Sequence, residues 1–162
     1  MRCMKKILGQ LGCVLSISLA LIGQVFAEDI KYSNEDIEKI VLEAKNFAIA
    51  KGKDAALKAF MDQNNAQFRK GSVYVSAFDF NGVCLAHIKA AMVGAQMIGL
   101  KDQNGVPLIK NLIAAAQNEK GGWTEYMWQN PVTNKVEKKY SFAMKIDDNW
   151  WITTGLYESE KK

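Results

Sequence analysis

The stretch SVYVSAFDFNGVCLAHI, residues 72–88, decides the fold class of this chain. Its first half is rich in β-branched and aromatic residues, which favour strands. Asn81-Gly82 in its middle is the strongest short signal for a tight hairpin turn. We therefore predict an antiparallel hairpin whose strands cover residues 72–80 and 83–88.

Two helices are predicted on the N-terminal side of this hairpin. Ser33, with Asp36 three residues later, resembles a capping box. Apolar residues then recur at helical spacing, which predicts a long helix over residues 33–51. Gly52 is a natural stop for that helix, and a second helix is expected from about residue 54 to about residue 64.

The sequence after the hairpin contains a mixed segment, a helix and three more strands. Residues 89–106 have no clear period, and Pro107 can begin a helix that continues to about Asn118. Consecutive strands joined by short turns form an antiparallel sheet. The order of elements predicts an α+β domain with its helices packed on one face of the sheet. The three further strands are predicted over residues 123–129, 137–146 and 150–157.

The first 27 residues have the pattern of a secretory signal peptide. Basic residues precede an apolar run that ends at Ala27, as in such signals. An uncleaved membrane anchor remains an alternative because the run is about 20 residues long, and a lipoprotein site at Cys13 is a weaker one. We predict an exported, periplasmic protein without a membrane span after cleavage. It would have one domain over residues 28–162, with its core over residues 33–157.

Charge and cysteine content exclude two classes of structure and function. Without its first 27 residues the chain carries 18 basic and 17 acidic residues. This near-neutral balance argues against nucleic-acid binding, which needs clustered Lys and Arg. Cys84 is the only cysteine left, so no intrachain disulfide can form, and we expect it to be a small buried residue.

No sequence pattern points to an enzyme, a metal site or a cofactor. His87 is the only histidine, so no second histidine can help to build a zinc site. Cys84 and His87 are three positions apart in a predicted strand and should face opposite sides. Phosphate-binding loops and nucleophile turns are absent from the sequence. A small hydrolase or isomerase with His87 as its base is the remaining enzymatic hypothesis.

Three aromatic residues lie close together in GGWTEYMWQNP, residues 121–131. On a strand, Tyr126 and Trp128 share one face while Trp123 occupies the other. One face of the sheet must pack on the long helix, and the other can form a pocket roofed by residues 89–120. The pattern alone favours a core role for each of the three aromatic residues.

Two lysines, Lys138 and Lys139, are adjacent in the next predicted strand, so only one of them can face inward. If Lys139 does, its ammonium group needs an anion, because a buried charge without a partner is costly. The carboxylate of a ligand is a candidate for that anion.

Taken in order, these segments resemble a single Cache domain of the second type. This is the extracellular, PAS-like sensor module of bacterial chemoreceptors and histidine kinases. The resemblance covers residues 33–157 and rests on D-x-x-G, L-A-H, G-G-W-x-x-Y-x-W, the following lysine and W-x-x-x-x-G-x-Y. It implies a long N-terminal helix over a central antiparallel sheet of about five strands. It also implies a pocket between that sheet and the segment before Gly121.

The resemblance further implies a non-catalytic domain that binds small organic molecules, often short carboxylates. Such a domain would report to a partner, for example a membrane receptor, a kinase or a transporter. Lys139 would be the carboxylate partner, and Trp128 is then expected to be plain core. Carried over position by position, the pocket residues are Tyr74, His87, Trp123, Tyr126, Lys139 and Tyr157.

Three departures from the family pattern affect this expectation. Ile88 follows His87 where the family usually has proline, and Phe142 replaces a usual tyrosine, which removes a hydroxyl from the expected pocket. The sequence ends at Lys162 without the transmembrane helix that usually follows, so we expect a freestanding protein. The main alternative is an interaction protein with a filled pocket, which modulates a partner through its surface.

Overall fold

The first helix has the predicted capping residues at both ends. The computed structural model describes residues 31–162, so the predicted signal peptide and its cleavage site lie outside the described residues. Ser33 and Asp36 form a complete capping box, and α1 runs over Asn34–Lys51. It stops at Gly52, whose φ of 83° is a conformation that favours glycine. The second helix, α2, follows at once over Lys53–Met61.

The stretch predicted as one strand over residues 72–80 is divided into two. Strands β1 (Arg69–Lys70) and β2 (Val73–Tyr74) form a small antiparallel sheet of their own. The chain then enters the main sheet as β3 (Ser76–Asp79). The division lies at Val75, whose amide donates to the carbonyl of Phe68 rather than to the main sheet. The predicted return strand is shorter than expected and becomes β4, Cys84–Ala86.

The remaining elements follow the predicted order. They are a short 3-10 helix η1 (Ala90–Met92), helix α3 (Leu108–Ala116), strands β5 (Gly122–Gln129), β6 (Val136–Lys145) and β7 (Trp150–Tyr157), and a 3-10 turn η2 (Glu158–Glu160). The main sheet has five strands in the order β4-β3-β7-β6-β5, and all its neighbours are antiparallel. The predicted five-stranded antiparallel sheet with a long N-terminal helix is therefore confirmed.

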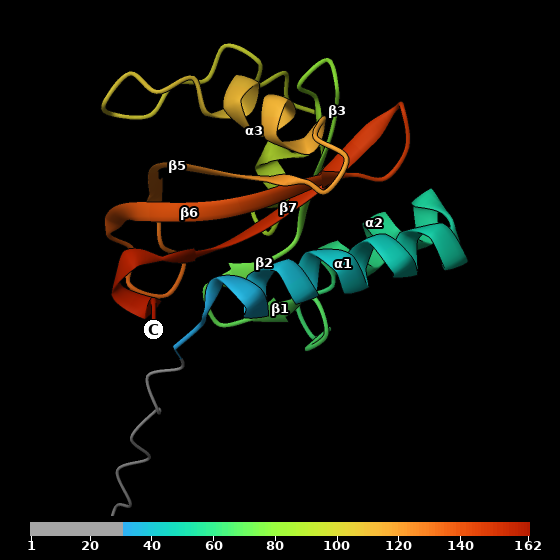
Figure 1. The fold of residues 1–162 in the computed structure, drawn as a ribbon, viewed down its shortest axis with the longest axis horizontal. Helices are drawn as coiled ribbons and strands as arrows, with labels where there is room; N and C mark the ends of the chain where they lie inside the picture. The colour runs from blue at the N-terminus through green and yellow to red at the C-terminus, as the bar shows by residue number, and fades with distance from the viewer. Residues whose placement is uncertain (1–30) are drawn as a thin grey trace, which may run out of the picture.

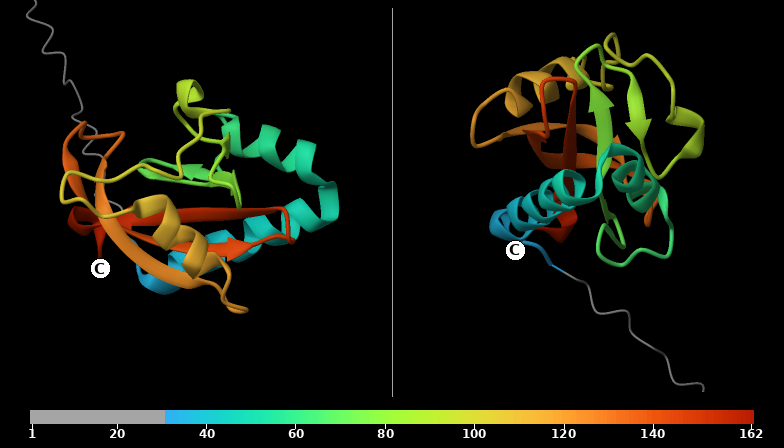
Figure 2. Two further views of the ribbon diagram at one scale, coloured as in Figure 1. Left: turned by 90° about the horizontal axis from the view of Figure 1, so that it is seen from above. Right: turned by 90° about the vertical axis from the view of Figure 1, so that its right-hand side faces the viewer.

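The helices lie on both sides of this sheet. Helices α1 and α2 lie on one side and α3 on the other (Figure 1 and Figure 2). The prediction that all helices share one face was therefore wrong for α3. The helix belongs instead to the segment that was expected to roof the opposite face. Within residues 31–162, no helix combines the length and hydrophobicity that a membrane crossing requires.

Alternation along β7 divides the interior into two cores. Trp150 and Ile152 point toward α1 and α2, whereas Trp151 points toward α3. We call the first the helix-face core; its largest members include Ile37, Val41, Phe60, Phe68, Phe142, Trp150, Ile152 and Leu156. We call the second the α3-face core; it includes Phe78, Cys84, Met97, Leu108, Ile109, Leu112, Ala143 and Trp151.

The two edge strands of the sheet, β4 and β5, differ in which parts of the chain cover them. The segment after η1 runs along β4, where Gly94 donates to the Cys84 carbonyl and Cys84 donates to the Ala95 carbonyl. On the outer side of β5, the Asp102 carboxylate accepts the Met127 amide at 2.7 Å.

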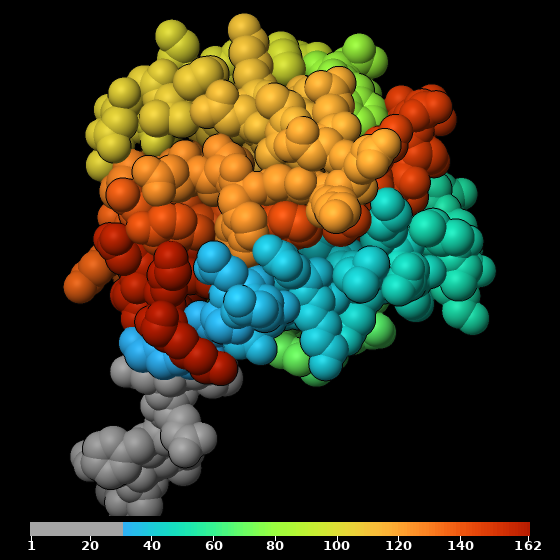
Figure 3. All heavy atoms as spheres, viewed as in Figure 1, coloured from blue at the N-terminus to red at the C-terminus, as the bar shows by residue number. Residues whose placement is uncertain are grey.

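Near the start of α1, shown in blue beside the red C-terminal turn in Figure 3, Tyr32 and Lys161 form a parallel bridge.

Candidate functional site

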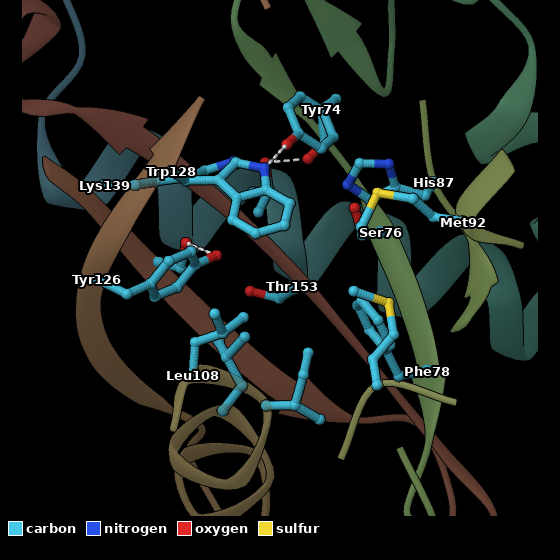
Figure 4. A pocket seen from close by; sticks show the side chains of 15 residues that line it. Tyr74, Ser76, Phe78, His87, Met92, Leu108, Tyr126, Trp128, Lys139 and Thr153 are labelled. Carbon is cyan, nitrogen blue, oxygen red and sulfur yellow. Dashed lines mark hydrogen bonds between the residues drawn. The ribbon is translucent and has the colours of Figure 1, made fainter. Parts of the chain in front are cut away.

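A cavity lies between the sheet and α3, on the face opposite α1 (Figure 4). Its volume is about 20 Å³. That is room for about one water molecule. Its wall consists of side chains from β2, β3, β5, β6, β7, α3 and the segment between β4 and α3. They are Tyr74, Ser76, Phe78, His87, Met92, Met97, Leu108, Ile109, Leu112, Tyr126, Trp128, Lys139, Ser141, Thr153 and Thr154.

Strand register brings the polar side chains of this wall together. Tyr126 on β5 is directly opposite Lys139 on β6, and Lys139 is directly opposite Tyr157 on β7. Directly opposite side chains in an antiparallel pair share a face and lie close together. Figure 4 shows Tyr126 and Trp128 on one side of the cavity and His87 on the other. The floor of the site is thus the sheet itself, and a rigid scaffold holds its polar groups.

Lys139 is a buried cation without an anionic partner among the described residues. It is only 2% exposed, and no hydrogen bond or ion pair within residues 31–162 involves its ammonium group. Its Nζ atom lies 4.0 Å from the ring centroid of Tyr74 and 5.0 Å from that of Tyr157. Such cation–π contacts offset part of the cost of burial. The adjacent Lys138 instead pairs with Glu125 at the surface, at 3.6 Å.

His87 is buried against the same group and is neutral at physiological pH. Its ring packs edge-on against Tyr74 with 5.3 Å between centroids. Burial, with the positive charges of Lys139 and Lys89, lowers the pKa of His87 to about 4. Its Nδ1 accepts the Lys89 amide at 3.0 Å, which places the proton of the neutral ring on Nε2. No described residue accepts a hydrogen bond from Nε2, so this donor remains available.

Hydroxyl groups complete the polar lining. Tyr126 and Ser141 share a hydrogen bond of 3.0 Å between their oxygens, and burial raises the pKa of Tyr126, which keeps it protonated. The Trp128 indole N–H donates to the hydroxyl of Tyr74 at 3.1 Å. Ser76 is buried, and it lines the cavity. One cation and several neutral donors therefore surround a small space, which suits an anion.

The six residues predicted for the pocket divide into three groups. Tyr74, His87, Tyr126 and Lys139 line the cavity. Tyr157 is not part of the cavity wall, although its ring centroid lies 5.0 Å from Nζ of Lys139, and its hydroxyl donates to the Gln129 carbonyl at 2.9 Å. All five of these side chains therefore belong to one connected cluster on the α3 face of the sheet.

Trp123, the sixth predicted residue, lies on the opposite face of the sheet. Its ring packs against Phe142, with 5.3 Å between centroids. Its indole N–H donates to Glu38 on α1 at 2.8 Å. Trp123 therefore does not line the cavity, and its contacts join β5 to the long helix.

Trp128 was expected to be plain core, and this was wrong, because it lines the cavity. The signal for its position was in the sequence. Alternation places Trp128 on the same face as Tyr126. Ser76 and Thr153 also line the cavity, and no motif in the sequence marked them. Short hydroxyl side chains in strands are common, and only the three-dimensional pairing of β3 with β7 brings these two together.

Cys84 lies in the α3-face core rather than in the wall of the cavity. Burial raises the pKa of its thiol to about 11, so it is protonated and unreactive at neutral pH. Across the part of the chain that the structure describes, no group of three or more His, Cys, Asp or Glu side chains is arranged to hold a metal ion. The polar groups of the cavity are thus the candidate site.

Comparison with known sequences and structures gives a consistent result. The sequence profile of the family named single Cache domain 2 matches residues 26–161. The crystal structure of a methyl-accepting chemotaxis protein from Vibrio parahaemolyticus RIMD 2210633 matches with a TM-score of 0.67 at 24% identity, over 76% of this chain and 86% of that chain.

Two further solved structures share the architecture. The periplasmic sensor domain of a chemotaxis protein matches with a TM-score of 0.59 at 22% identity, over 76% of this chain and 89% of that chain. A Cache chemosensory domain described for its recognition of carboxylic acids matches with a TM-score of 0.58 at 19% identity, over 75% of this chain and 85% of that chain. At these identities, the likeness of the three structures shows a common fold.

Proposed function

Because the chain belongs to the single Cache domain 2 family, we propose that it is a sensor domain that binds a small organic anion. Binding would be reversible and non-catalytic, at the cavity between the sheet and α3. The observation that carries this proposal is the buried ammonium group of Lys139, which no described anion neutralises. A buried charge is stable when it is paired and hydrogen-bonded, and a bound carboxylate supplies both interactions.

The neutral donors around Lys139 support a carboxylate as the anion. A carboxylate has two oxygens that accept several hydrogen bonds. One oxygen can contact the ammonium group of Lys139, while the other accepts from Nε2 of His87 or from the hydroxyl of Ser76. One structurally similar Cache domain was described for its recognition of carboxylic acids, and we extend that chemistry to this chain as part of the proposal.

The state of His87 supports a non-catalytic role. A general base is most effective when its pKa is near the working pH. The pKa of His87 is instead about 4, and the charges that lower it belong to two lysines. A histidine that serves as a neutral hydrogen-bond donor fits this environment better than a base does.

We further propose that residues 28–162 act as one exported domain in the periplasm. It would report ligand binding through a partner protein such as a membrane receptor, a kinase or a transporter. This part of the proposal follows from family membership and from the predicted signal peptide.

A thermal-shift screen tests the binding proposal. We expect a short carboxylate among C2–C4 acids, amino acids and amines to raise the unfolding temperature, since a ligand at a hundredfold excess over its Kd stabilises a protein by about 2.7 kcal/mol. Lys139→Met should abolish the shift because it removes the cation and keeps the side-chain length. Lys138→Met is the matched control and should retain the shift. A carboxylate shift that persists in Lys139→Met would contradict the proposal.

The volume of the cavity favours a second function. A cavity of about 20 Å³ is far smaller than the roughly 300 Å³ at the low end of small-molecule sites. The alternative is an interaction protein whose site is filled and which modulates a partner through its surface. This alternative predicts no thermal shift with any member of the panel.

A further inference from the structure

Access to the cavity is limited to one side. Every side chain in its wall is buried except those of Met92 and Trp128, which are half-buried. Met92 is at the end of η1, and Trp128 is near the end of β5. A molecule that enters from solvent must therefore pass between these two side chains or displace one of them.

Trp128 separates the cavity from a second, larger space. It also lines an open groove on the outside of β5, together with Lys89, Asp102, Gln103, Met127, Gln129 and Val136. The volume of this groove, measured in the same way as the cavity, is about 280 Å³. We call it the outer groove. Among residues 31–162, Trp128 is the one residue that lines both spaces.

Few polar interactions hold Trp128 in this position. Its indole N–H donates to Tyr74, and its ring lies edge-on to Tyr126 and His87 at centroid distances of 6.2 Å and 6.4 Å. On the solvent side, Lys89 donates to the Gln129 side chain at 2.6 Å and so links the segment that leads into η1 with β5. This second bond is exposed, where competition with water weakens such interactions.

We propose that Trp128 is a gate that determines the length of the ligand. This inference rests on the proposed function, in which the anionic head of the ligand binds at Lys139. With the indole closed, the cavity has room for about one water molecule, so a carboxylate head group must displace part of its wall and an alkyl tail has no space. When the indole rotates away from Tyr74, the cavity and the outer groove become one site for a straight-chain monocarboxylate.

The side chains of the outer groove fit a hydrocarbon tail. Its apolar members are Met127, Val136 and the outer face of Trp128 itself, and Val136 is 51% exposed. Of the polar members, Lys89 and Gln129 bond to each other, and Asp102 accepts the Met127 amide; Gln103 is the remaining polar side chain of the groove. An apolar tail in the groove would cover Val136 without leaving a polar group of the ligand unpaired.

Affinities for a series of straight-chain acids from acetate to octanoate test the gate. The wild-type protein, Trp128→Ala and the matched control Trp123→Ala would be compared by calorimetry. Trp123 is half-buried on the same strand but faces α1. In the wild type, long acids bind only to the open state, and its low population weakens their binding in proportion. Trp128→Ala removes the closed state, so it should raise the octanoate-to-acetate affinity ratio by about tenfold or more. Trp123→Ala should leave this ratio unchanged.

The two proposals fail in different ways in this experiment. If acetate binds in a Lys139-dependent manner but the ratio is the same in Trp128→Ala and wild type, the gate is overturned and the proposed function stands. If no acid binds to any variant, the proposed function is overturned and the gate with it. Both results differ from the expected one, in which only Trp128→Ala changes the ratio.

A conservative variant keeps the test valid if Trp128→Ala fails to fold. Trp128→Phe retains an aromatic ring but removes the donor to Tyr74. We expect hexanoate to associate faster with Trp128→Phe than with wild type in stopped-flow experiments, while acetate is affected less. Equal hexanoate rates in the two proteins would overturn the gate.

Discussion

The two faces of the central sheet are formed by the same strands but differ in what they bury. On the helix face, β7 contributes Trp150, Ile152 and Leu156 to a core of apolar side chains. On the α3 face, the same strands surround Lys139 and His87, which are the buried lysine and the buried histidine of residues 31–162. The helix face is organised for stability. The α3 face contains a buried cation that no described anion neutralises, and such a charge is costly.

The largest effect should come from a cavity created in the helix face. Phe60 is 1% exposed and packs edge-on against Phe68. Phe60→Ala should lower the free energy of unfolding by about 3–5 kcal/mol, because it removes a buried ring from a close-packed core. Urea denaturation measures this loss. Leu42→Ala, at a side chain that is 49% exposed on α1, is the control and should cost far less. Equal losses in the two variants would contradict the assignment of Phe60 to a close-packed core.

The next effect should appear as a pH dependence that originates on the α3 face. The pKa of His87 falls from 6.5 to about 4 on folding. The unfolded chain therefore binds the proton more tightly, and stability decreases as the pH falls through this window. From about pH 7.5 to about pH 5 the loss should be about 2 kcal/mol. Carboxyl groups with a lowered pKa, such as Glu137, lose most of their contribution below about 4.5, the ordinary value for Glu, so His87 dominates this window.

The control for this prediction is His87→Gln, which cannot be protonated. Its unfolding free energy should be nearly flat between about pH 7.5 and about pH 5. The groups that face His87 are Lys139, Lys89 and the ring of Tyr74. Denaturation curves at several pH values measure the slope. The same slope in wild type and His87→Gln would show that the pH dependence comes from elsewhere.

The smallest effect should be a gain in stability. Lys139→Met replaces a buried, unpaired ammonium group with an apolar side chain of similar length, and it should raise the free energy of unfolding of the ligand-free protein by about 1 kcal/mol. The adjacent Lys138 is exposed and pairs with Glu125, so Lys138→Met should have little effect. Chemical denaturation of the two variants measures the difference. A Lys139→Met protein that is less stable than wild type would mean that the buried cation is already compensated.

Much of the fold was predictable because its signals are local. The capping box at Ser33 depends on neighbouring residues and was confirmed. The hairpin predicted around Asn81-Gly82 is also present, although its turn is closed by the Gly82 amide on the Asp79 carbonyl and so has Phe80 and Asn81 at its centre. The division of the predicted strand at Val75 was not predictable, because it depends on the pairing of Val75 with Phe68. A strand-like composition does not reveal which of two sheets a residue will join.

The site was predictable where alternation applied and less so where it did not. Alternation correctly separates Trp123 from Tyr126, and it also placed Trp128 on the face of Tyr126, although Trp128 was assigned to plain core. The prediction that Cys84 and His87 face opposite sides was wrong, since both lie on the α3 face. Strand β4 ends at Ala86, and the period of a strand no longer applies beyond it. The volume of the cavity depends on the packing of α3 and η1, which the sequence does not specify.

The carboxylate of Asp102 has a consequence for how copies of this protein behave toward one another. A sheet edge with free amides is a template on which a strand of another molecule can pair, and such pairing leads to aggregation. The chain covers β4 with its own backbone, but within residues 31–162 no strand pairs with the outer side of β5. The Asp102 carboxylate accepts a hydrogen bond from one backbone amide on that side, the amide of Met127. A single side chain thereby makes self-assembly through this edge less favourable, while the groove beside it stays open.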